Sequence, residues 1–298
     1  MRTVLEPFFA GMICCPLCKA NLKLSPNTFI CYNCGTEFRK KGGIPDFRLI
    51  APEYARSSAQ AQWLEGQKGF EEYATNVSLN DRIDFFLAEI DSVQEIYTQH
   101  FMPFYGSLLD VGGSRGTLRH FLNPSVKYLV IDPQIDAFEG IELQSGLMHA
   151  YPFLSQPCNF LAGFAEHLPL TSCQFDFVHM RSVIDHFFDP VLSIKEAFRV
   201  LKDDGRLMIG VSTYSPEAKE PIFRFKLMHK LQRANFVIRN EGVSGLIARL
   251  RNRFSFESDH HMWKWEKDDL LDLIGKCGFV VDKMVQQKPP FEYCIYML

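Results

Sequence analysis

Short, nearly continuous apolar runs alternate with helix-length segments from about residue 107 onward. The runs read SLLDVGG, YLVID, NFLAG, FDFVHM and RLMIGVS. Strands buried on both faces of a parallel sheet have this appearance, and their alternation with helices is typical of β-α-β units. Nearer the C-terminus, LLDLIGKCGFVVDKMV and FEYCIYML predict a helix and two further strands. We therefore predict an α/β fold: a doubly wound, seven-stranded sheet with helices on both faces.

The segment before this domain has a helical pattern that weakens toward the N-terminus. Residues 48–80 mix small and polar residues around a few aromatic ones, which suggests a linker with some helix. Between residues 81 and 104, apolar residues recur at helical spacing, at Ile83, Phe86, Leu87, Ile90, Val93, Ile96 and Tyr97. We expect a linker and N-terminal helices over 49–105, followed by the α/β domain over 106–298.

Residues 1–48 contain two C-x-x-C pairs, Cys15 with Cys18 and Cys31 with Cys34. The stretch is too short to bury a self-sufficient hydrophobic core, so it needs a cross-link through its cysteines to be stable. Four thiolates surround Zn²⁺ tetrahedrally and leave no open position for chemistry, so we predict a zinc ribbon with a structural ion. Two alternatives stay open: Cys14 can replace Cys15 as a ligand, and the four cysteines can be structural or redox-active without a metal.

Composition restricts the compartment and the partners. The chain has nine cysteines, and an odd total with two paired knuckles is typical of a metal site in a reducing compartment. No apolar run approaches the ~20 residues that span a bilayer. The N-terminus weakly resembles a signal peptide, but Glu6 and Pro7 interrupt its apolar stretch. We expect a cytoplasmic protein. Its net charge of −3 and its pI of about 6.3 make nucleic acid the less favoured partner.

A glycine-rich turn follows the first strand of the domain, in LLDVGGSRG at 108–116. Gly112 allows the tight turn, and the small residues after it let a ligand approach the backbone. Asp132 ends the second strand, about 20 residues further on, where a carboxylate accepts hydrogen bonds from ribose hydroxyls. The alternative for Asp132 is a helix N-cap or a turn. NAD would also suit this pattern, but GGSRG lacks the full G-x-G-x-x-G spacing.

Five motifs occur in a fixed order: DVGGSRG, IDPQID, GFAEHLPL, FDFVHMRSVIDHFFDP and EAFRVLKDDGRLMI. In this order they resemble the class I S-adenosylmethionine-dependent methyltransferases, which have a Rossmann-like fold. The subgroup that they resemble, methyltransferase type 11, includes the ubiquinone and menaquinone biosynthesis enzymes. The resemblance covers residues 100–215 and resumes at 259–281.

This resemblance implies S-adenosylmethionine as the cofactor and a set of residues that bind it. The methionine and ribose part lies against Asp110, Gly112, Gly113, Ser114 and Gly116, and Asp132 holds the ribose. Phe164 and Ala165 flank the adenine, and Met180 lies beside the methionine moiety. Two positions depart from the family pattern. Ser114 replaces the middle glycine, and Phe164 stands where many relatives have an aspartate that binds the adenine amino group, so that stacking and backbone contacts would hold the base.

The catalytic chemistry needs orientation of the cofactor and, for a hydroxyl acceptor, a base. His186 follows the fourth strand and is our candidate base; the alternative is a histidine that caps or packs the next helix. Asp185 can orient His186 or simply begin that helix. Arg181 can meet an anionic substrate group, although a solvated arginine is the favoured interpretation. His260 and His261, beside two tryptophans, are a further candidate patch over the acceptor.

An insertion at about 216–258 carries local positive charge on an otherwise acidic chain. Between Glu217 and Arg253, nine Lys or Arg residues stand against three acidic ones. Apolar residues within it fall at helical spacing, which predicts a basic amphipathic helix. It can attract an anionic acceptor, rest on an anionic membrane surface as a peripheral contact, or pack as an ordinary lid helix.

These features favour a methyltransferase that acts on a small-molecule, glycan or lipid-linked acceptor, by O- or N-methylation. One alternative is an RNA methyltransferase, because the ribbon resembles that of the bacterial rRNA guanine-N1 methyltransferases. Another is a non-catalytic scaffold or cofactor-binding module. GGIPDF at 42–47 resembles the zinc-ribbon proteins that activate other methyltransferases.

Overall fold

The computed structural model describes residues 3–48, 63–64, 66–67, 69, 83–135, 145–213, 262–287 and 294–298. The basic insertion at 216–258, together with His260 and His261, lies outside these residues. None of the helices within the described part of the chain combines the length and the apolarity that a bilayer crossing requires.

The main sheet has eight strands in the order β1-β8-β7-β6-β9-β10-β12-β11. Its pairs are parallel except where β12 meets β10 and β11. The strands are β1 (Thr3–Val4), β6 (Ser107–Val111), β7 (Lys127–Ile131), β8 (Cys158–Leu161), β9 (Phe175–Arg181), β10 (Leu201–Ser212), β11 (Met284–Gln286) and β12 (Cys294–Met297). The expected α/β architecture is confirmed. The expected seven strands are all present, but β1, from the N-terminus, adds an eighth at the edge beside β8.

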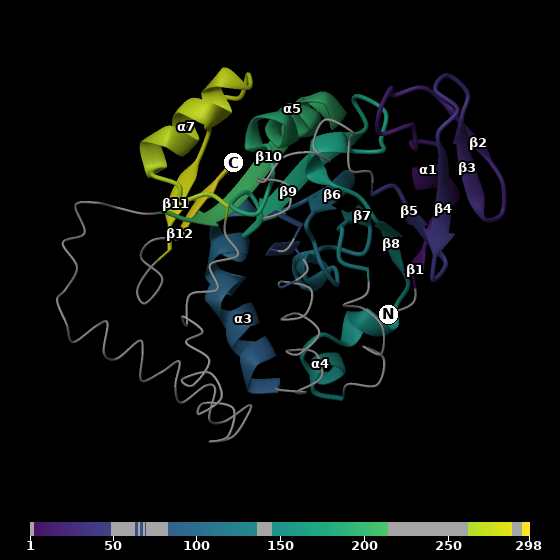
Figure 1. Cartoon of the computed structure of the whole chain (residues 1–298). Coiled ribbons are helices and arrows are strands. Elements are labelled where there is room, and N and C mark those ends of the chain that lie inside the picture. Colours follow the sequence, from purple (N-terminus) through teal and green to yellow (C-terminus); the bar gives the residue numbers. More distant parts are fainter. Residues whose placement is uncertain are drawn as a thin grey trace, which may run out of the picture.

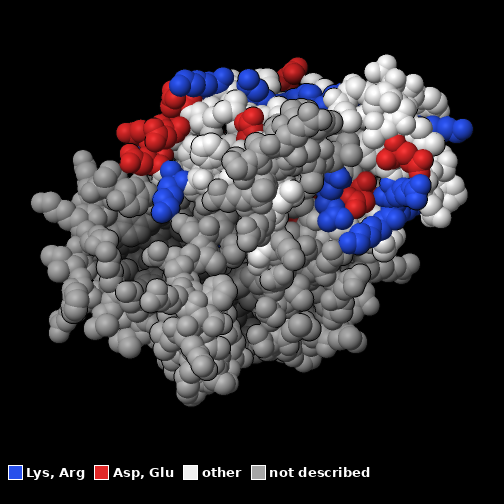
Figure 2. All heavy atoms as spheres, viewed as in Figure 1, with Lys and Arg blue, Asp and Glu red and all other residues white. Residues whose placement is uncertain are grey.

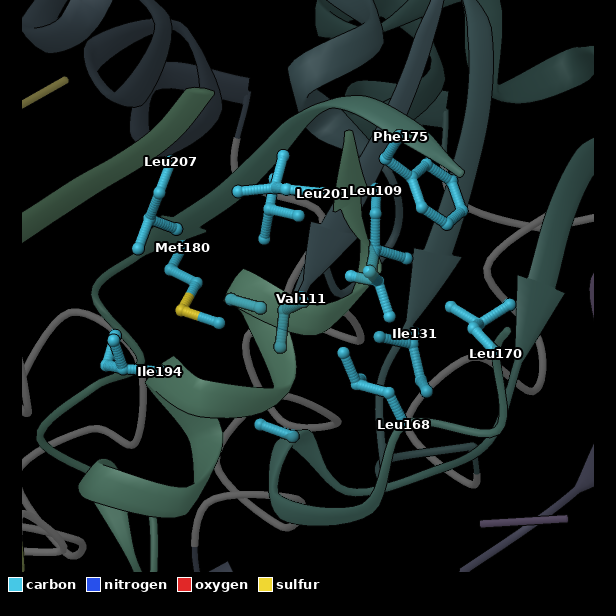
Figure 3. Packing of buried hydrophobic residues seen from close by; sticks show 14 of the residues in the cluster. Leu109, Val111, Ile131, Leu168, Leu170, Phe175, Met180, Ile194, Leu201 and Leu207 are labelled. Atoms are coloured by element: carbon cyan, nitrogen blue, oxygen red, sulfur yellow. The ribbon is translucent and has the colours of Figure 1, made fainter. Parts of the chain in front are cut away.

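Helices cover both faces of the sheet (Figure 1). The cluster on one face includes residues of α1 (Pro7–Ala10), α5 (Pro190–Val200) and α7 (Lys267–Lys276). The cluster on the other includes residues of α3 (Ile83–Ile96), the π-helix η1 (Tyr97–Phe101), the 3₁₀-helix η2 (Thr117–Phe121), α4 (Ser145–Ala150) and η5 (Pro152–Ser155). Leu109 belongs to the first cluster and Leu108 to the second, as strand alternation requires. Figure 3 shows the first cluster, in which Leu109, Val111 and Ile131 pack among buried residues of β9 and β10.

One short element is less regular than the predicted helix-length segments. The glycine turn opens onto η2, a 3₁₀-helix of five residues. Leu118 and Phe121 of η2 are buried against the sheet. The helical pattern at 81–104 is confirmed as α3 continued by η1. Tyr97 and Phe101 of η1 are buried, so the irregular turn places large rings over the sheet.

The cysteine-rich segment forms a second, antiparallel sheet with the strand order β2-β3-β4-β5. Its strands are β2 (Leu22–Leu24), β3 (Thr28–Cys31), β4 (Glu37–Lys41) and β5 (Ile44–Asp46). After β5 the chain runs beside the end of β8, where the Phe47 N–H donates to the Ala162 carbonyl at 2.8 Å and the Ala162 N–H to that of Pro45 at 2.9 Å. Phe29, Phe38 and Phe47 join the core cluster of the large domain. The small sheet therefore buries its apolar side against the larger one.

Candidate functional site

A cavity of about 300 Å³ opens at the carboxyl ends of β6, β7, β8 and β9. This is the edge of an open α/β sheet where ligands bind, because the loops there diverge at the change in strand order. Residues of α3 and η1 form the opposite wall. Eight predicted site residues line it: Asp110, Gly112, Gly113, Ser114, Asp132, Phe164, Ala165 and His186. The structure thus brings most of the predicted site together, and each residue's role in binding stays a prediction.

The glycine turn approaches its neighbours too closely for side chains. Gly112 has φ +68°, and a Cβ there would lie 2.4 Å from Cγ1 of Val183. A Cβ on Gly113 would lie 2.5 Å from the Asp110 carboxyl group. Ser114 itself has φ +48°, a left-handed conformation that is uncommon outside glycine. The packing against Val183 and Asp110 therefore requires glycine at positions 112 and 113.

Asp132 holds this turn against the end of β7. Its Oδ2 accepts the Ser114 N–H at 2.8 Å and its Oδ1 accepts the Gln134 N–H at 2.8 Å. The side chain is buried yet lines the cavity. Each carboxylate oxygen has a second lone pair, so the same group can also accept bonds from a ribose. Asp132 can therefore hold the glycine turn and bind a ribose at the same time.

A buried chain of polar side chains borders the cavity beside Asp110. His179 Nδ1 lies 2.7 Å from Asp110 Oδ1, and His179 Nε2 lies 2.7 Å from the Tyr97 hydroxyl. The Tyr128 hydroxyl donates to the other oxygen of Asp110. Burial, above all, and then the Asp110 charge raise the pKa of Tyr128 well above its usual value, so it remains a donor. Asp110, His179 and Tyr97 line the cavity, whereas Tyr128 lies behind it.

The loop after β9 carries His186 and is held by two tryptophans. The indole N–H of Trp63 donates to the His186 carbonyl at 2.9 Å, and that of Trp263 donates to the Phe187 carbonyl at 2.7 Å. His186 Nε2 lies 3.9 Å from Asp185 Oδ1, which is beyond hydrogen-bond distance. His186 thus reaches the cavity, but its ring lacks the close orienting contact with Asp185 that a dyad would show.

Glu166 connects the loops that follow β8 and β9. Its Oε1 accepts the Phe188 N–H at 2.8 Å and the Asp189 N–H at 3.3 Å. Burial raises the pKa of Glu166 in spite of these bonds, which favour the charged form. The carboxyl group therefore fixes the separation of two loops that line the cavity.

Two of the predicted site residues, Gly116 and Met180, are not among the described residues that line the cavity. Met180 is fully buried in the first core cluster (Figure 3). Side chains alternate along β9, so His179 and Arg181 meet the cavity and Met180 faces the opposite side of the sheet. Gly116, with φ +74°, begins η2.

Trp63, Arg115 and His179 are not among the residues predicted for the site, and a solvated position was the favoured interpretation of Arg181. All four line the cavity. A signal for His179 existed, because a histidine inside an apolar strand must find a partner. Trp63 offered no comparable signal, since it lies more than forty residues before the domain.

The four knuckle cysteines converge on one point. The Sγ atoms of Cys15, Cys18, Cys31 and Cys34 all lie within 4.8 Å of one another. The Cys15–Cys34 and Cys18–Cys31 sulfur distances are 3.7 and 3.4 Å. Tetrahedral zinc with Zn–S bonds of about 2.3 Å would need sulfurs roughly 3.8 Å apart. The donor set therefore fits a tetrahedral ion, and the cluster contains Cys15 and excludes Cys14, whose N–H instead bonds the Pro169 carbonyl at 3.0 Å.

The α/β domain is similar to known methyltransferases over part of its length. Residues 109–209 match the family model described as a methyltransferase domain. An uncharacterised methyltransferase of Bacillus subtilis, YcgJ, is 32% identical over 111 residues, which is 37% of this chain and 42% of that protein. The chain thus matches about two fifths of that relative's length.

Solved structures of methyltransferases are also similar to this chain. A putative methyltransferase from Bacillus halodurans is 22% identical, with 65% of this chain and 71% of that one covered and a TM-score of 0.43. A methyltransferase from Thermotoga maritima, described as a possible histamine N-methyltransferase, is 18% identical, with 79% and 97% covered and a TM-score of 0.45.

The glycine turn and the aspartate at the end of β7 lie within residues 109–209, the segment that matches the methyltransferase domain model. The match extends from within β6 to within β10 and so includes the four strand ends around the cavity.

Proposed function

We propose that the protein transfers a methyl group from S-adenosylmethionine to a small-molecule, glycan or lipid-linked acceptor. The observation that carries this proposal is Asp132, which lines the cavity while it holds the glycine turn by the Ser114 N–H. When bound, the cofactor supplies an electrophilic methyl group on a sulfonium. The protein then has to hold the two reactants in line and keep water out.

An acceptor hydroxyl or protonated amine must also lose a proton. His186 is one candidate base. The chain Tyr97–His179–Asp110 is better supported by geometry, because both of its bonds to His179 measure 2.7 Å. With Nδ1 donating to Asp110, the Nε2 of neutral His179 accepts from Tyr97. Tyr97 can then take the acceptor's proton as it passes its own to His179.

An anionic group on the acceptor is supported by arginines of the cavity. Arg115 and Arg181 both line it and bring positive charge to the cavity. Guanidinium groups bind carboxylates and phosphates in two-bond geometry. On the face of the molecule in Figure 2, by contrast, described Lys and Arg side chains lie among Asp and Glu. An anionic small molecule fits this distribution better than a nucleic acid does.

We also propose that Cys15, Cys18, Cys31 and Cys34 bind a structural Zn²⁺. Four protein ligands complete a tetrahedron and leave no position for a substrate. The N–H groups of Asn33 and Cys34 each lie 3.4 Å from Cys31 Sγ, as donors that stabilise a thiolate.

The decisive experiment is calorimetric titration of S-adenosylmethionine into the full-length protein and into Asp132→Ala. We expect micromolar binding by the native chain and a loss of at least about tenfold in Asp132→Ala, since a charge-assisted bond contributes about 1.5–3 kcal/mol. Asp204→Ala, which removes an exposed carboxylate of β10, is the control and should bind like the native chain. Absence of binding to the folded native protein would refute the proposed activity.

A further inference from the structure

Two aromatic rings from distant parts of the chain meet at one wall of the cavity. Trp63 belongs to the segment before the methyltransferase domain, and Phe164 lies just beyond β8. Their ring centroids are 5.0 Å apart with planes inclined by 60°, and both residues line the cavity. Phe188 lies 5.8 Å from Trp63 on another side, and the indole N–H bonds the His186 carbonyl. The indole is therefore held by its neighbours and presents a defined surface.

This wall adjoins the position of Asp132. β7 and β8 are parallel neighbours, and the Asp132 N–H donates to the Leu161 carbonyl at 3.1 Å. The loop from Gly163 to Ala165 thus begins beside Asp132, and all three of its residues line the cavity. A nucleoside whose ribose is bound by Asp132 would place its base against this loop.

The carboxylates among the described lining residues are directed elsewhere. Asp110 bonds His179 and Tyr128, and Asp132 bonds the backbone at Ser114 and Gln134. Glu166 accepts from the N–H groups of Phe188 and Asp189, on the loop after β9. None of these three carboxylates is shown bonded at the wall that Phe164 and Trp63 form, and both of those residues present aromatic rings to the cavity.

We propose that Trp63 is a cofactor-binding residue and that, with Phe164, it binds the purine by contact between aromatic surfaces. The base is then selected by the shape and π surface of its rings, and its exocyclic amino group contributes little. This inference rests on the proposed function, because it assumes that the cavity binds S-adenosylmethionine or its product.

The first test compares two probes that differ only in that amino group. S-adenosylhomocysteine carries it, and its purine-riboside analogue has a hydrogen atom in its place. We expect the full-length, zinc-loaded protein to bind both within about threefold by calorimetry. Phe164→Asp, which supplies a carboxylate acceptor, should raise the preference for the adenine compound by about tenfold, since a hydrogen bond with a charged partner contributes about 1.5–3 kcal/mol.

The second test measures the contribution of Trp63. Stacking of a base on an aromatic side chain is worth about 1–3 kcal/mol, so Trp63→Leu should weaken both probes by about tenfold and leave their ratio unchanged. Trp63→Phe keeps a ring and should lose less than Trp63→Leu. Trp263→Phe is the matched control: its indole N–H bonds the adjacent carbonyl of the same loop, but Trp263 is not among the described cavity residues. It should bind both probes within about twofold of the native chain.

The outcomes separate this inference from the proposed function. If the native protein binds neither probe nor S-adenosylmethionine, both proposals fail. If it binds them but prefers adenine by far more than tenfold, or if Trp63→Leu binds as well as Trp263→Phe does, the aromatic subsite is refuted and the proposed function stands. Circular dichroism of each variant shows whether it is folded. Phe164→Asp tests the same wall if Trp63→Leu does not fold.

Discussion

Asp110 and His179 are polar residues that are buried beside the cavity. Their side chains are 4% and 5% exposed, and His179 Nδ1 lies 2.7 Å from Asp110 Oδ1. A buried carboxylate without partners is costly, and here His179 and Tyr128 each occupy one of its oxygens. The burial of Asp110 therefore depends on both His179 and Tyr128, whether or not Asp110 takes part in the chemistry.

Replacement of His179 tests this dependence. We expect His179→Leu to lower the free energy of unfolding by about 1.5–3 kcal/mol, because it leaves Asp110 with one of its two side-chain donors. Urea unfolding of the two proteins at pH 7 measures the difference. His120→Leu, which changes an exposed histidine of η2, should change the stability much less. Equal stability of His179→Leu and the native chain would show that the buried pair contributes nothing net.

The tautomer of His179 follows from the same geometry. Carboxylates accept only, so the contact with Asp110 requires a proton on Nδ1. Nitrogen-detected NMR of labelled protein should therefore show protonated Nδ1 in His179. Neutral imidazole protonated at Nε2 would contradict the proposed relay, because Nε2 could not then accept from Tyr97.

Side chains from different elements hold the cysteine-rich sheet against the methyltransferase domain. Glu196 of α5 bonds Lys19 at 2.5 Å and Arg199 at 2.7 Å. Lys19 Nζ also donates to the Leu168 carbonyl, so one side chain joins the first knuckle to the loop before β9. Burial raises the pKa of Glu196, but the bonds to Arg199 and Lys19 outweigh burial and hold it below its usual value.

Glu196→Gln should destabilise the protein by about 1–3 kcal/mol at pH 7, since both cations lose their charged partner. Because the folded-state pKa is lowered, this contribution is present above the unfolded pKa of about 4.3. It is lost as the pH falls through the lower folded-state value. Unfolding curves at pH 7, 5 and 3.5 should therefore show a difference between variant and native chain that shrinks at the lowest pH.

Glu37→Gln is the control for this prediction. Glu37 pairs with Arg39 at 2.9 Å, but both side chains are exposed, and exposed pairs contribute about 0–1 kcal/mol. A loss as large as that of Glu196→Gln would mean that burial is not the source of the effect.

At the scale of the whole molecule, the sheet that carries the four clustered cysteines and the cavity are connected through β5. Arg48, just after this strand, donates to the Pro133 carbonyl at 2.8 Å, next to Asp132. Phe47 bonds Ala162, which precedes the loop that carries Phe164. Through these contacts, the folded state of the cysteine-rich sheet affects two loops that line the cavity.

Removal of the metal should lower the melting temperature by several degrees and weaken binding of S-adenosylmethionine. The reason is that the bound ion would cross-link the four cysteines and so stabilise the cysteine-rich sheet. A chelator titration followed by calorimetry and elemental analysis measures both effects, with one zinc per chain expected beforehand. Cys18→Ser should behave like the chelated protein. Cys173→Ser, which changes an exposed cysteine outside the cluster, should retain the zinc. A chelated protein with an unchanged melting temperature would contradict a structural ion.

Local patterns in the sequence were sufficient for the sheet, the helix at 83–96, the cluster of four cysteines and the glycine turn with Asp132. Each depends on the spacing of residues close together in the chain: apolar runs, paired cysteines, and a turn followed by an acidic residue. The parallel order of the strands then brings their loops to one edge, which is why residues as distant as Asp110 and His186 meet there.

Tertiary structure alone decided the rest. The N-terminal residues become the edge strand β1, because β8 offers unpaired backbone groups that local propensity cannot reveal. Trp63 reaches the cavity by packing on Phe164 and Phe188, which lie about a hundred residues further along the chain. His179 meets the cavity and Met180 does not, because pairing with β6 and β10 sets the register of β9 and so decides which of its faces borders the cavity. Sequence thus determined which elements form and where their ends carry chemistry, whereas long-range packing determined which side chains face the ligand.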